Sequence, residues 1–140
     1  MQTSSIEQIL QGKGSLLMIA HGNSMWPLLR SGKDPIYLKK PTGALRKHDI
    51  ALFRRDNGQL VLHRIVAIEK ECCLVCGDAQ SRRECIQTEQ VKGVMCGFYR
   101  GKTYIGCDHL LYQIYTRLWC AAYPLRVGLL NLKFSTRKRS

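Results

Sequence analysis

The sequence predicts a mainly β domain with a helical segment at each end. Short apolar stretches alternate with turn signals through the middle of the chain, and apolar residues at helical spacing occur only near its two ends. A length of 140 residues suits a single domain, and 45% hydrophobic and 23% charged residues are typical of a globular protein. Many short strands with regular turns favour a coiled or barrel-like sheet.

The first half of the chain contains one expected helix and four expected strands. Ser4 or Ser5 can cap a short helix that runs to Gln11, after which Gly12 and Gly14 end it. The strands are expected at residues 15–20, 34–38, 50–54 and 60–68. The last two should pair, because the Asp-Asn-Gly sequence between them is a hairpin signal.

The second half completes the sheet and then becomes helical. Strands are expected at residues 72–76, 90–99 and 103–105, and a polar loop at 80–84. From His109 apolar residues recur at helical spacing until Pro124, and a second amphipathic stretch follows at 125–134. The expected organisation is a β domain at 1–108 with its core at 15–105, an amphipathic helical tail at 109–134, and a basic, disordered end at 135–140.

The formal net charge of +12 raises nucleic acids, anionic membranes and acidic peptides as partners. No acidic residue follows Asp108, whereas six basic residues do: Arg117, Arg126, Lys133, Arg137, Lys138 and Arg139. Nucleic acid is not an expected partner, because no helix-turn-helix precedes residue 15 and basic residues do not interleave with aromatic ones. Residues 109–140 suit peripheral contact with an anionic membrane through Tyr112, Tyr115, Trp119 and Tyr123, although the helix could equally pack on the β domain.

Seven cysteines are scattered along the chain with no obvious paired framework, which favours a reducing compartment. Cys73 and Cys76 have the spacing of metal and redox sites, but no second pair stands at a comparable distance, so neither a metal nor a cofactor is expected. The first residues lack the features of a signal peptide, and charged residues and a proline interrupt the apolar stretch 110–132. The expected location is cytoplasmic, with the inner face of a membrane as a peripheral alternative.

Ser24 and His63 are the candidates for chemistry. Ser24 lies at the end of an expected strand in the turn-rich segment Gly22-Asn23-Ser24-Met25-Trp26-Pro27. A serine in such a segment is usually only a turn former. His63 lies in the middle of an apolar strand, where burying an imidazole without a partner is costly. It is either a hydrogen-bonded structural histidine or a general base, since an ordinary imidazole titrates at about pH 6.5.

Four segments occur in order: Gly22-Asn23-Ser24-Met25-Trp26-Pro27, Lys47-His48-Asp49-Ile50-Ala51-Leu52-Phe53, His63-Arg64-Ile65-Val66 and Gly77-Asp78. Over residues 15 to about 105 they resemble the signal-peptidase/LexA-like serine peptidases. The pattern of that family is a Gly-x-Ser-Met-x-Pro turn, a Gly-Asp-x-x-x-Phe strand, a basic strand with the catalytic base, and a Gly-Asp turn. The histidine followed by arginine is similar to the archaeal and endoplasmic-reticulum branch, and the short chain with its basic helical tail resembles short soluble members from Bacteroides-like bacteria.

The resemblance implies a LexA/signal-peptidase-like coiled β-barrel and a serine endopeptidase that processes a peptide or protein substrate. Ser24 would be the nucleophile and His63 the general base, and the resemblance implies Asp78 as the acid that orients the imidazole, or Glu84 as an alternative or second acid. We favour Asp78, because it ends an expected strand whereas Glu84 lies in a polar loop beside arginines. The oxyanion and the substrate would be bound by the turn itself, through Ser24, Asn23 and Met25.

The chain departs from the family pattern at Gly22, where some members carry an oxyanion serine, and at His48, where glycine is usual. The membrane anchor of true signal peptidases is also absent from the sequence. The alternative function is therefore a catalytically inactive peptide-binding or regulatory protein of the same fold.

Overall fold

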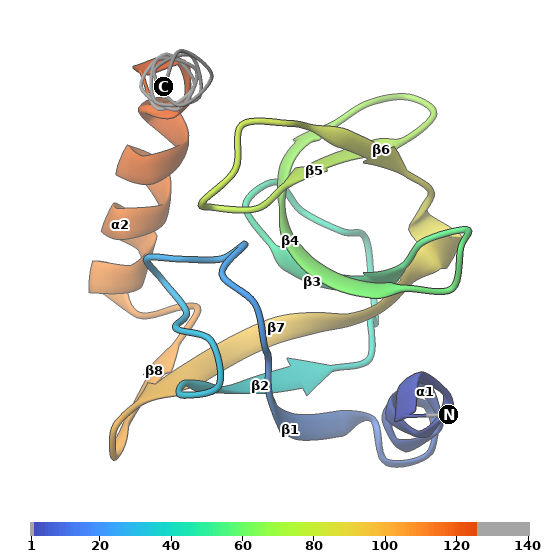
Figure 1. Cartoon of the computed structure of the whole chain (residues 1–140). Coiled ribbons are helices and arrows are strands. Elements are labelled where there is room, and N and C mark those ends of the chain that lie inside the picture. The colour runs from blue at the N-terminus through green and yellow to red at the C-terminus, as the bar shows by residue number, and fades with distance from the viewer. Residues whose placement is uncertain (1, 126–140) are drawn as a thin grey trace, which may run out of the picture.

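The computed structural model describes residues 2–125, and one antiparallel sheet forms the body of this part of the chain (Figure 1). The sheet has eight strands in the order β1-β2-β7-β3-β4-β5-β6, and β8 pairs with the C-terminal half of β7. The strands are β1 (Ser15–Ile19), β2 (Pro35–Lys39), β3 (Ile50–Arg54), β4 (Leu60–Ile68), β5 (Cys73–Cys76), β6 (Glu84–Ile86), β7 (Val91–Arg100) and β8 (Thr103–Gly106). Helix α1 (Gln2–Lys13) precedes the sheet, helix α2 (Leu110–Ala121) follows it, and a 3-10 turn at Thr88–Gln90 precedes β7. The expected mainly β class with a helix at each end is confirmed.

The sheet bends strongly, so that β4, β5 and β6 lie above β1, β2 and β7 in Figure 1. Register shifts interrupt the pairing of β2 with β7, of β3 with β7, and of β4 with β5. An irregularity of this kind increases the local twist and lets the strand bend. The bend brings the turn after β1 close to β4, which is how residues far apart in sequence come to line one cavity.

The β3–β4 hairpin forms where the sequence predicts it. Both strands begin and end at the expected residues, and they pair from Ile50 opposite Arg64 to Arg54 opposite Leu60. Gly58 has a φ of 91°, which explains the glycine in the hairpin turn. Side chains then alternate along the strand, so His63 and its neighbour Arg64 point to opposite faces.

Two apolar clusters fill the bent sheet. The larger cluster includes Leu10 of α1 with Ile36, Leu52 and Met95 of the sheet, and the smaller includes Phe53 of β3. The smaller cluster is completed by Ala51, Ile65, Cys73, Val75, Ile86 and Val91. Because side chains alternate along a strand, β3 contributes Ile50 and Leu52 to the larger cluster and Ala51 and Phe53 to the smaller one, and it separates them.

The region around β5 and β6 corrects two sequence predictions. Residues 84–86 form a short strand on β5 rather than part of a polar loop, and a three-residue strand carries too little alternation to be recognised. Cys72, just before β5, and Cys85, in the middle of β6, form a disulfide, so the scattered cysteines do contain one pair. Cys73 and Cys76 are buried as expected for small apolar side chains. Residues 2–125 contain no group of three or more His, Cys, Asp or Glu residues that could hold a metal ion.

Helix α2 packs on the β domain through its aromatic face. Tyr112 and Thr116 are buried, Trp119 Nε1 donates to the backbone oxygen of Asp78 at 2.9 Å, and the Tyr123 hydroxyl donates to that of Ser81. The aromatic residues that the sequence assigned to a membrane interface therefore hold the helix on the sheet. Most of the amphipathic stretch 125–134 and all of the end 135–140 lie outside the described residues. No helix in the described part of the chain is long and apolar enough to cross a membrane.

Candidate functional site

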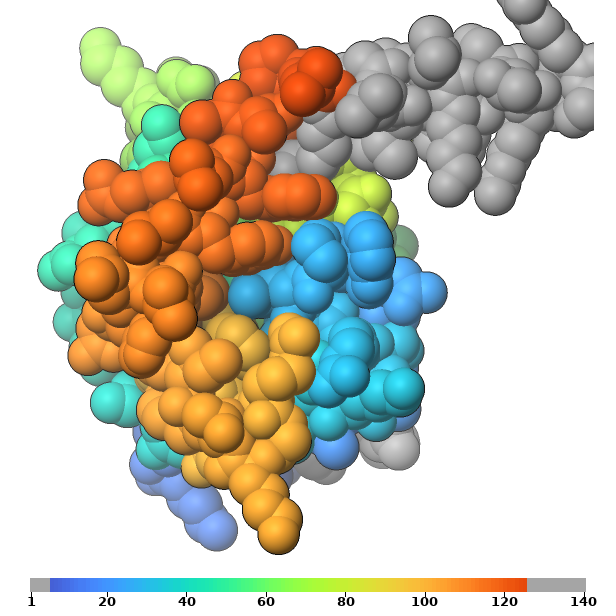
Figure 2. Space-filling model, turned by 90° about the vertical axis from the view of Figure 1, so that its left-hand side faces the viewer, coloured from blue at the N-terminus to red at the C-terminus, as the bar shows by residue number. Residues whose placement is uncertain are grey.

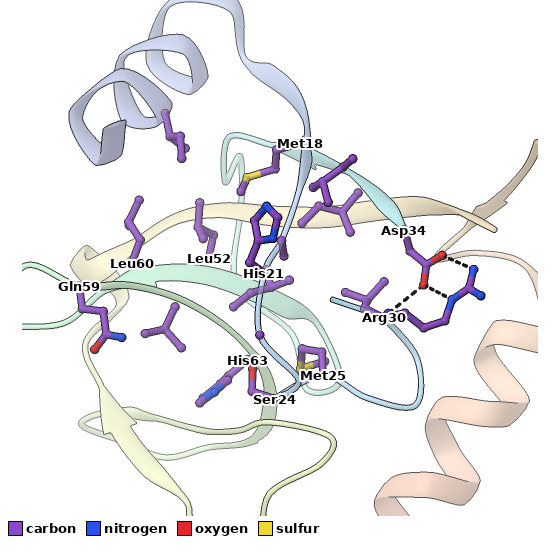
Figure 3. A pocket seen from close by; sticks show the side chains of 18 of the residues that line it. Met18, His21, Ser24, Met25, Arg30, Asp34, Leu52, Gln59, Leu60 and His63 are labelled. Carbon is purple, nitrogen blue, oxygen red and sulfur yellow. Dashed lines mark hydrogen bonds and ion pairs between the residues drawn. The ribbon is translucent and has the colours of Figure 1, made fainter. Parts of the chain in front are cut away.

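A cavity of about 700 Å³ lies between the turn after β1 and strands β3 and β4, and both Ser24 and His63 line it (Figure 3). Much of its wall is apolar, with side chains from β1, β3 and β4 that include Met18, Leu52 and Leu62. Ser24 and His63 are joined by six further polar or charged residues in the lining: His21, Arg30, Asp34, Arg55, Gln59 and Gln80. An apolar hollow with a few convergent polar groups is the usual form of a ligand or substrate site.

Ser24 is held in a hydrogen-bonded turn that the sequence pattern explains. Gly22 has a φ of 101°, a conformation that favours glycine, and its N–H donates to Ser31 Oγ at 2.7 Å. The Trp26 N–H donates to the backbone oxygen of Asn23 at 3.1 Å, and Met25 is buried in the larger apolar cluster. Met25 thus anchors the turn and also lines the cavity, whereas Asn23 is exposed and is not among the lining residues.

The turn after β5 supports Ser24 from behind. The Ala79 N–H donates to the backbone oxygen of Ser24 at 2.9 Å. A Cβ atom added to Gly77 would lie 2.5 Å from that same oxygen, so only glycine fits at this contact. Among the described residues, the Ser24 backbone N–H forms no hydrogen bond, which leaves it available to an oxyanion.

His63 projects from β4 at the side of the cavity that holds Ser24, and Figure 3 shows the two side chains next to each other. The imidazole is 3% exposed, and the Phe53 ring packs against it with centroids 5.9 Å apart. Burial, and then the positive charge of Arg55, lowers its pKa to about 4, although Glu84 and Asp78 oppose this shift. The imidazole is therefore neutral at pH 7 and able to accept a proton.

The hydrogen bonds of His63 are incomplete. Its Nδ1 atom is buried without a hydrogen-bond partner, and no hydrogen bond joins the imidazole to Ser24 Oγ in the part of the chain that the structure describes. Catalytic hydrogen bonds are often long before substrate binds and become shorter in the substrate complex. The site therefore contains a serine and a candidate general base, but no side chain in the described residues accepts a hydrogen bond from His63 Nδ1 to fix the orientation of the imidazole.

Asp78 does not supply that group, contrary to the expectation that it orients His63. Its two carboxylate oxygens each accept a hydrogen bond from Arg64 at 2.8 Å, and the Tyr115 hydroxyl contacts one of them at 3.1 Å. The physical reason is strand alternation, because Arg64 points to the side where α2 packs and His63 to the other. Burial alone would lower the pKa of Arg64, but the contacts with Asp78 raise it above its ordinary value, so the guanidinium stays charged.

Glu84 is also committed to an arginine. Arg55 donates from Nε and Nη2 to the two Glu84 oxygens, each at 3.0 Å, with both side chains about a third exposed. This pair and His63 line a second cavity of about 710 Å³ together with the polar loop at 79–83. Neither Asp78 nor Glu84 donates to or accepts from His63 in the described residues, and both act on the imidazole through their charge alone.

Three residues of this region were missed by sequence reasoning. In the sequence Arg64 is only the residue after His63 in the family-like segment, yet it pairs with Asp78 and contacts the Tyr112 and Thr116 hydroxyls at 3.3 Å. Arg55, in the connection between β3 and β4, lowers the pKa of His63, and His21 lines the cavity three residues before Ser24. The buried arginine followed by a Gly-Asp turn was a signal for an ion pair, whereas nothing in the local sequence points to Arg55 or His21.

The arrangement can perform one kind of chemistry without any added group: a hydroxyl next to a neutral imidazole, with a backbone N–H free at the same turn, can attack a carbonyl carbon. Comparison with known protein families finds no family that matches the chain, and no curated protein sequence matches it.

Proposed function

We propose that this protein is a serine endopeptidase that cleaves a peptide or protein substrate through Ser24 and His63. The observation that carries the proposal is that these two residues, from the turn after β1 and from the middle of β4, line the same side of one largely apolar cavity. A structural histidine would have its ring nitrogens satisfied, yet His63 Nδ1 is buried without a partner. A neutral, unpartnered imidazole beside an accessible hydroxyl suits a general base.

The reaction would proceed through an acyl-enzyme. Ser24 Oγ attacks the carbonyl carbon of the scissile peptide bond while His63 takes the hydroxyl proton, and the carbonyl oxygen becomes an oxyanion near the Ser24 N–H. His63 then returns the proton to the leaving amine as the C–N bond breaks. Water hydrolyses the resulting ester with His63 again as base, which restores both side chains. Since Asp78 and Glu84 are bound to arginines, the pair acts as a dyad.

Two structural details favour the resemblance to the signal-peptidase/LexA-like peptidases, whose coiled barrel we propose as the finer fold. His48, where the family pattern has glycine, has a φ of 81°, a backbone conformation that favours glycine. Gly77 of the Gly-Asp motif is in tight contact with the Ser24 backbone. The two positions where the family pattern has glycine, 48 and 77, are therefore positions where the backbone of this protein favours glycine.

A fluorophosphonate probe tests the nucleophile directly, because it reacts only with an activated serine. We expect one adduct on the full-length protein by intact-mass analysis, located to Ser24 by peptide mapping. Ser24→Ala should abolish the adduct and His63→Gln should slow its formation at least 100-fold, about the contribution of a general base. Ser15→Ala, in β1 away from the cavity, should label like the wild type and serves as the control. Labelling that persists in His63→Gln at the wild-type rate would exclude His63 as the base.

A second candidate is a protein that binds peptide in this cavity without cleaving it. The observation that favours it is the absence of a hydrogen bond between Ser24 Oγ and the His63 imidazole in the described residues. Isothermal titration with peptides from a random library distinguishes the two functions. Binding that is unchanged in Ser24→Ala, without turnover or probe labelling by the wild type, would identify a binding protein.

A further inference from the structure

The outward face of α2 is apolar and lies at the surface. The exposed fractions of its side chains are 71% for Leu110, 68% for Leu111, 45% for Ile114 and 65% for Leu118, and Leu125 beyond the helix end is 70% exposed. At about 100° per residue the four positions within the helix fall within roughly 100° of arc. Figure 2 shows α2 running across the face of the protein turned toward the viewer. A stripe of this kind is usually turned toward a core, and here it is turned away.

The helix is oriented this way because polar contacts hold its other face. Tyr112 and Thr116 contact Arg64 at 3.3 Å, and Tyr115 contacts Asp78 at 3.1 Å. These bonds to a buried ion pair commit the aromatic and hydroxyl side to the sheet. The exposed apolar side chains Leu110, Leu111, Ile114, Leu118 and Leu125, called the leucine stripe below, therefore do not result from a loosely placed helix.

Beside the stripe lies a small cavity of about 280 Å³ with a strongly positive lining. Its basic residues are Lys47, His48, Arg83 and Arg117, and no carboxylate is among the residues that line it. Neither Lys47 nor Arg117 forms an ion pair within the described part of the chain. Burial, then Lys47, Arg64 and Arg117, lowers the pKa of His48 against the opposing effect of Asp49, which agrees with a positive potential at this site.

We propose that this face binds the surface of an anionic phospholipid membrane. The leucine stripe would enter the interface between headgroups and acyl chains, and a headgroup phosphate would be bound at the cavity by Lys47 and Arg117. The sequence after Asp108 contains six basic residues and no acidic one, so its charge favours the same surface. A second copy of the protein fits less well, because joining two such faces would bring their cations together without carboxylates to pair them. The inference does not depend on the peptidase activity.

Co-sedimentation of the full-length protein with lipid vesicles tests the proposal. We expect binding to vesicles of phosphatidylglycerol and phosphatidylcholine, weak binding to phosphatidylcholine alone, and weaker binding as salt rises. Leu118→Glu, in the middle of the stripe, should reduce binding at least tenfold. Lys47→Gln combined with Arg117→Gln should reduce binding to the anionic vesicles selectively. Ile68→Glu is the control, because this side chain at the end of β4 is 49% exposed and lies outside the stripe.

Three outcomes would overturn the proposal. The first is an absence of vesicle binding by the wild type, and the second is an equal loss in Ile68→Glu and Leu118→Glu. The third is a change from dimer to monomer in Leu118→Glu on analytical ultracentrifugation while vesicle binding stays the same, which would assign the stripe to contact between copies. Circular dichroism of each variant separates these results from unfolding, and exposed positions such as Leu118 should leave the spectrum unchanged.

Discussion

Replacing Asp78 by asparagine separates the role that the structure gives this residue from the role of a triad acid. Asp78 and Arg64 are 2% and 1% exposed, and two hydrogen bonds of 2.8 Å join them. Asparagine keeps one acceptor oxygen but turns an amide N–H₂ group toward the guanidinium, which leaves a buried charge without its partner. Breaking a buried ion pair in this way costs about 3–5 kcal/mol, a large share of the roughly 5–15 kcal/mol that stabilises a domain. Urea unfolding followed by circular dichroism should therefore show a marked fall in the free energy of unfolding.

Glu84→Gln is the matched control for Asp78→Asn. Its ion pair with Arg55 is about a third exposed on both sides, so the same change should lower the free energy of unfolding by less than about 1 kcal/mol. The folded fraction of Asp78→Asn should keep most of its peptide cleavage, because the substitution removes no hydrogen bond to His63. Any loss of activity should come only from displacement of the turn that holds Ser24. If Asp78→Asn unfolds within 1 kcal/mol of the wild type yet loses about four orders of magnitude in kcat, the residue is a triad acid and this reasoning fails.

Three further predictions concern His63, Gly77 and the disulfide. The pKa of His63 is about 4 in the folded protein and 6.5 ordinarily, so between these pH values mainly the unfolded chain binds the proton. The free energy of unfolding should therefore fall by about 3 kcal/mol as the pH is lowered from above 6.5 to about 4. Unfolding at pH 7 and pH 4 should show this loss in the wild type and a smaller loss in His63→Gln; equal losses would contradict it. Gly77→Ala should slow probe labelling at least tenfold by displacing the serine backbone, whereas Gly43→Ala, with nothing within 4 Å of the added carbon, should not. Non-reducing mass analysis should find Cys72 linked to Cys85, and reduction should lower the free energy of unfolding by about 2–3 kcal/mol; a fully reduced protein that is equally stable would refute this.

The sheet could be predicted from sequence because most of its strands combine apolar runs with clear turn signals. The β3–β4 hairpin lies at its predicted residues because an Asp-Asn-Gly turn separates two β-branched and apolar runs. β6 was missed because it has three residues and is held largely by its pairing with β5. Tertiary pairing of this kind leaves little trace in a local sequence window.

The candidate site was predicted in part. Ser24 and His63 were identified from motif order, and the structure brings both to one cavity. The structure joins Asp78 to Arg64 and not to His63, because sequence proximity to a motif does not show which face of β4 a carboxylate meets. Arg64 competes for that carboxylate with two hydrogen bonds, and the competition depends on how α2 packs. The direction of the leucine stripe on α2 follows from the same packing.

Cleavage of a defined peptide library by the wild-type protein, by Ser24→Ala, by His63→Ala and by the double variant tests the central claim most directly. The account predicts that the wild type cleaves a subset of peptides at defined bonds. It also predicts that the three variants are folded and equally inactive, since residues that act as one unit fail together. Cleavage by Ser24→Ala at the wild-type rate, or no cleavage of any peptide by a wild-type protein that also resists the fluorophosphonate probe, would contradict it.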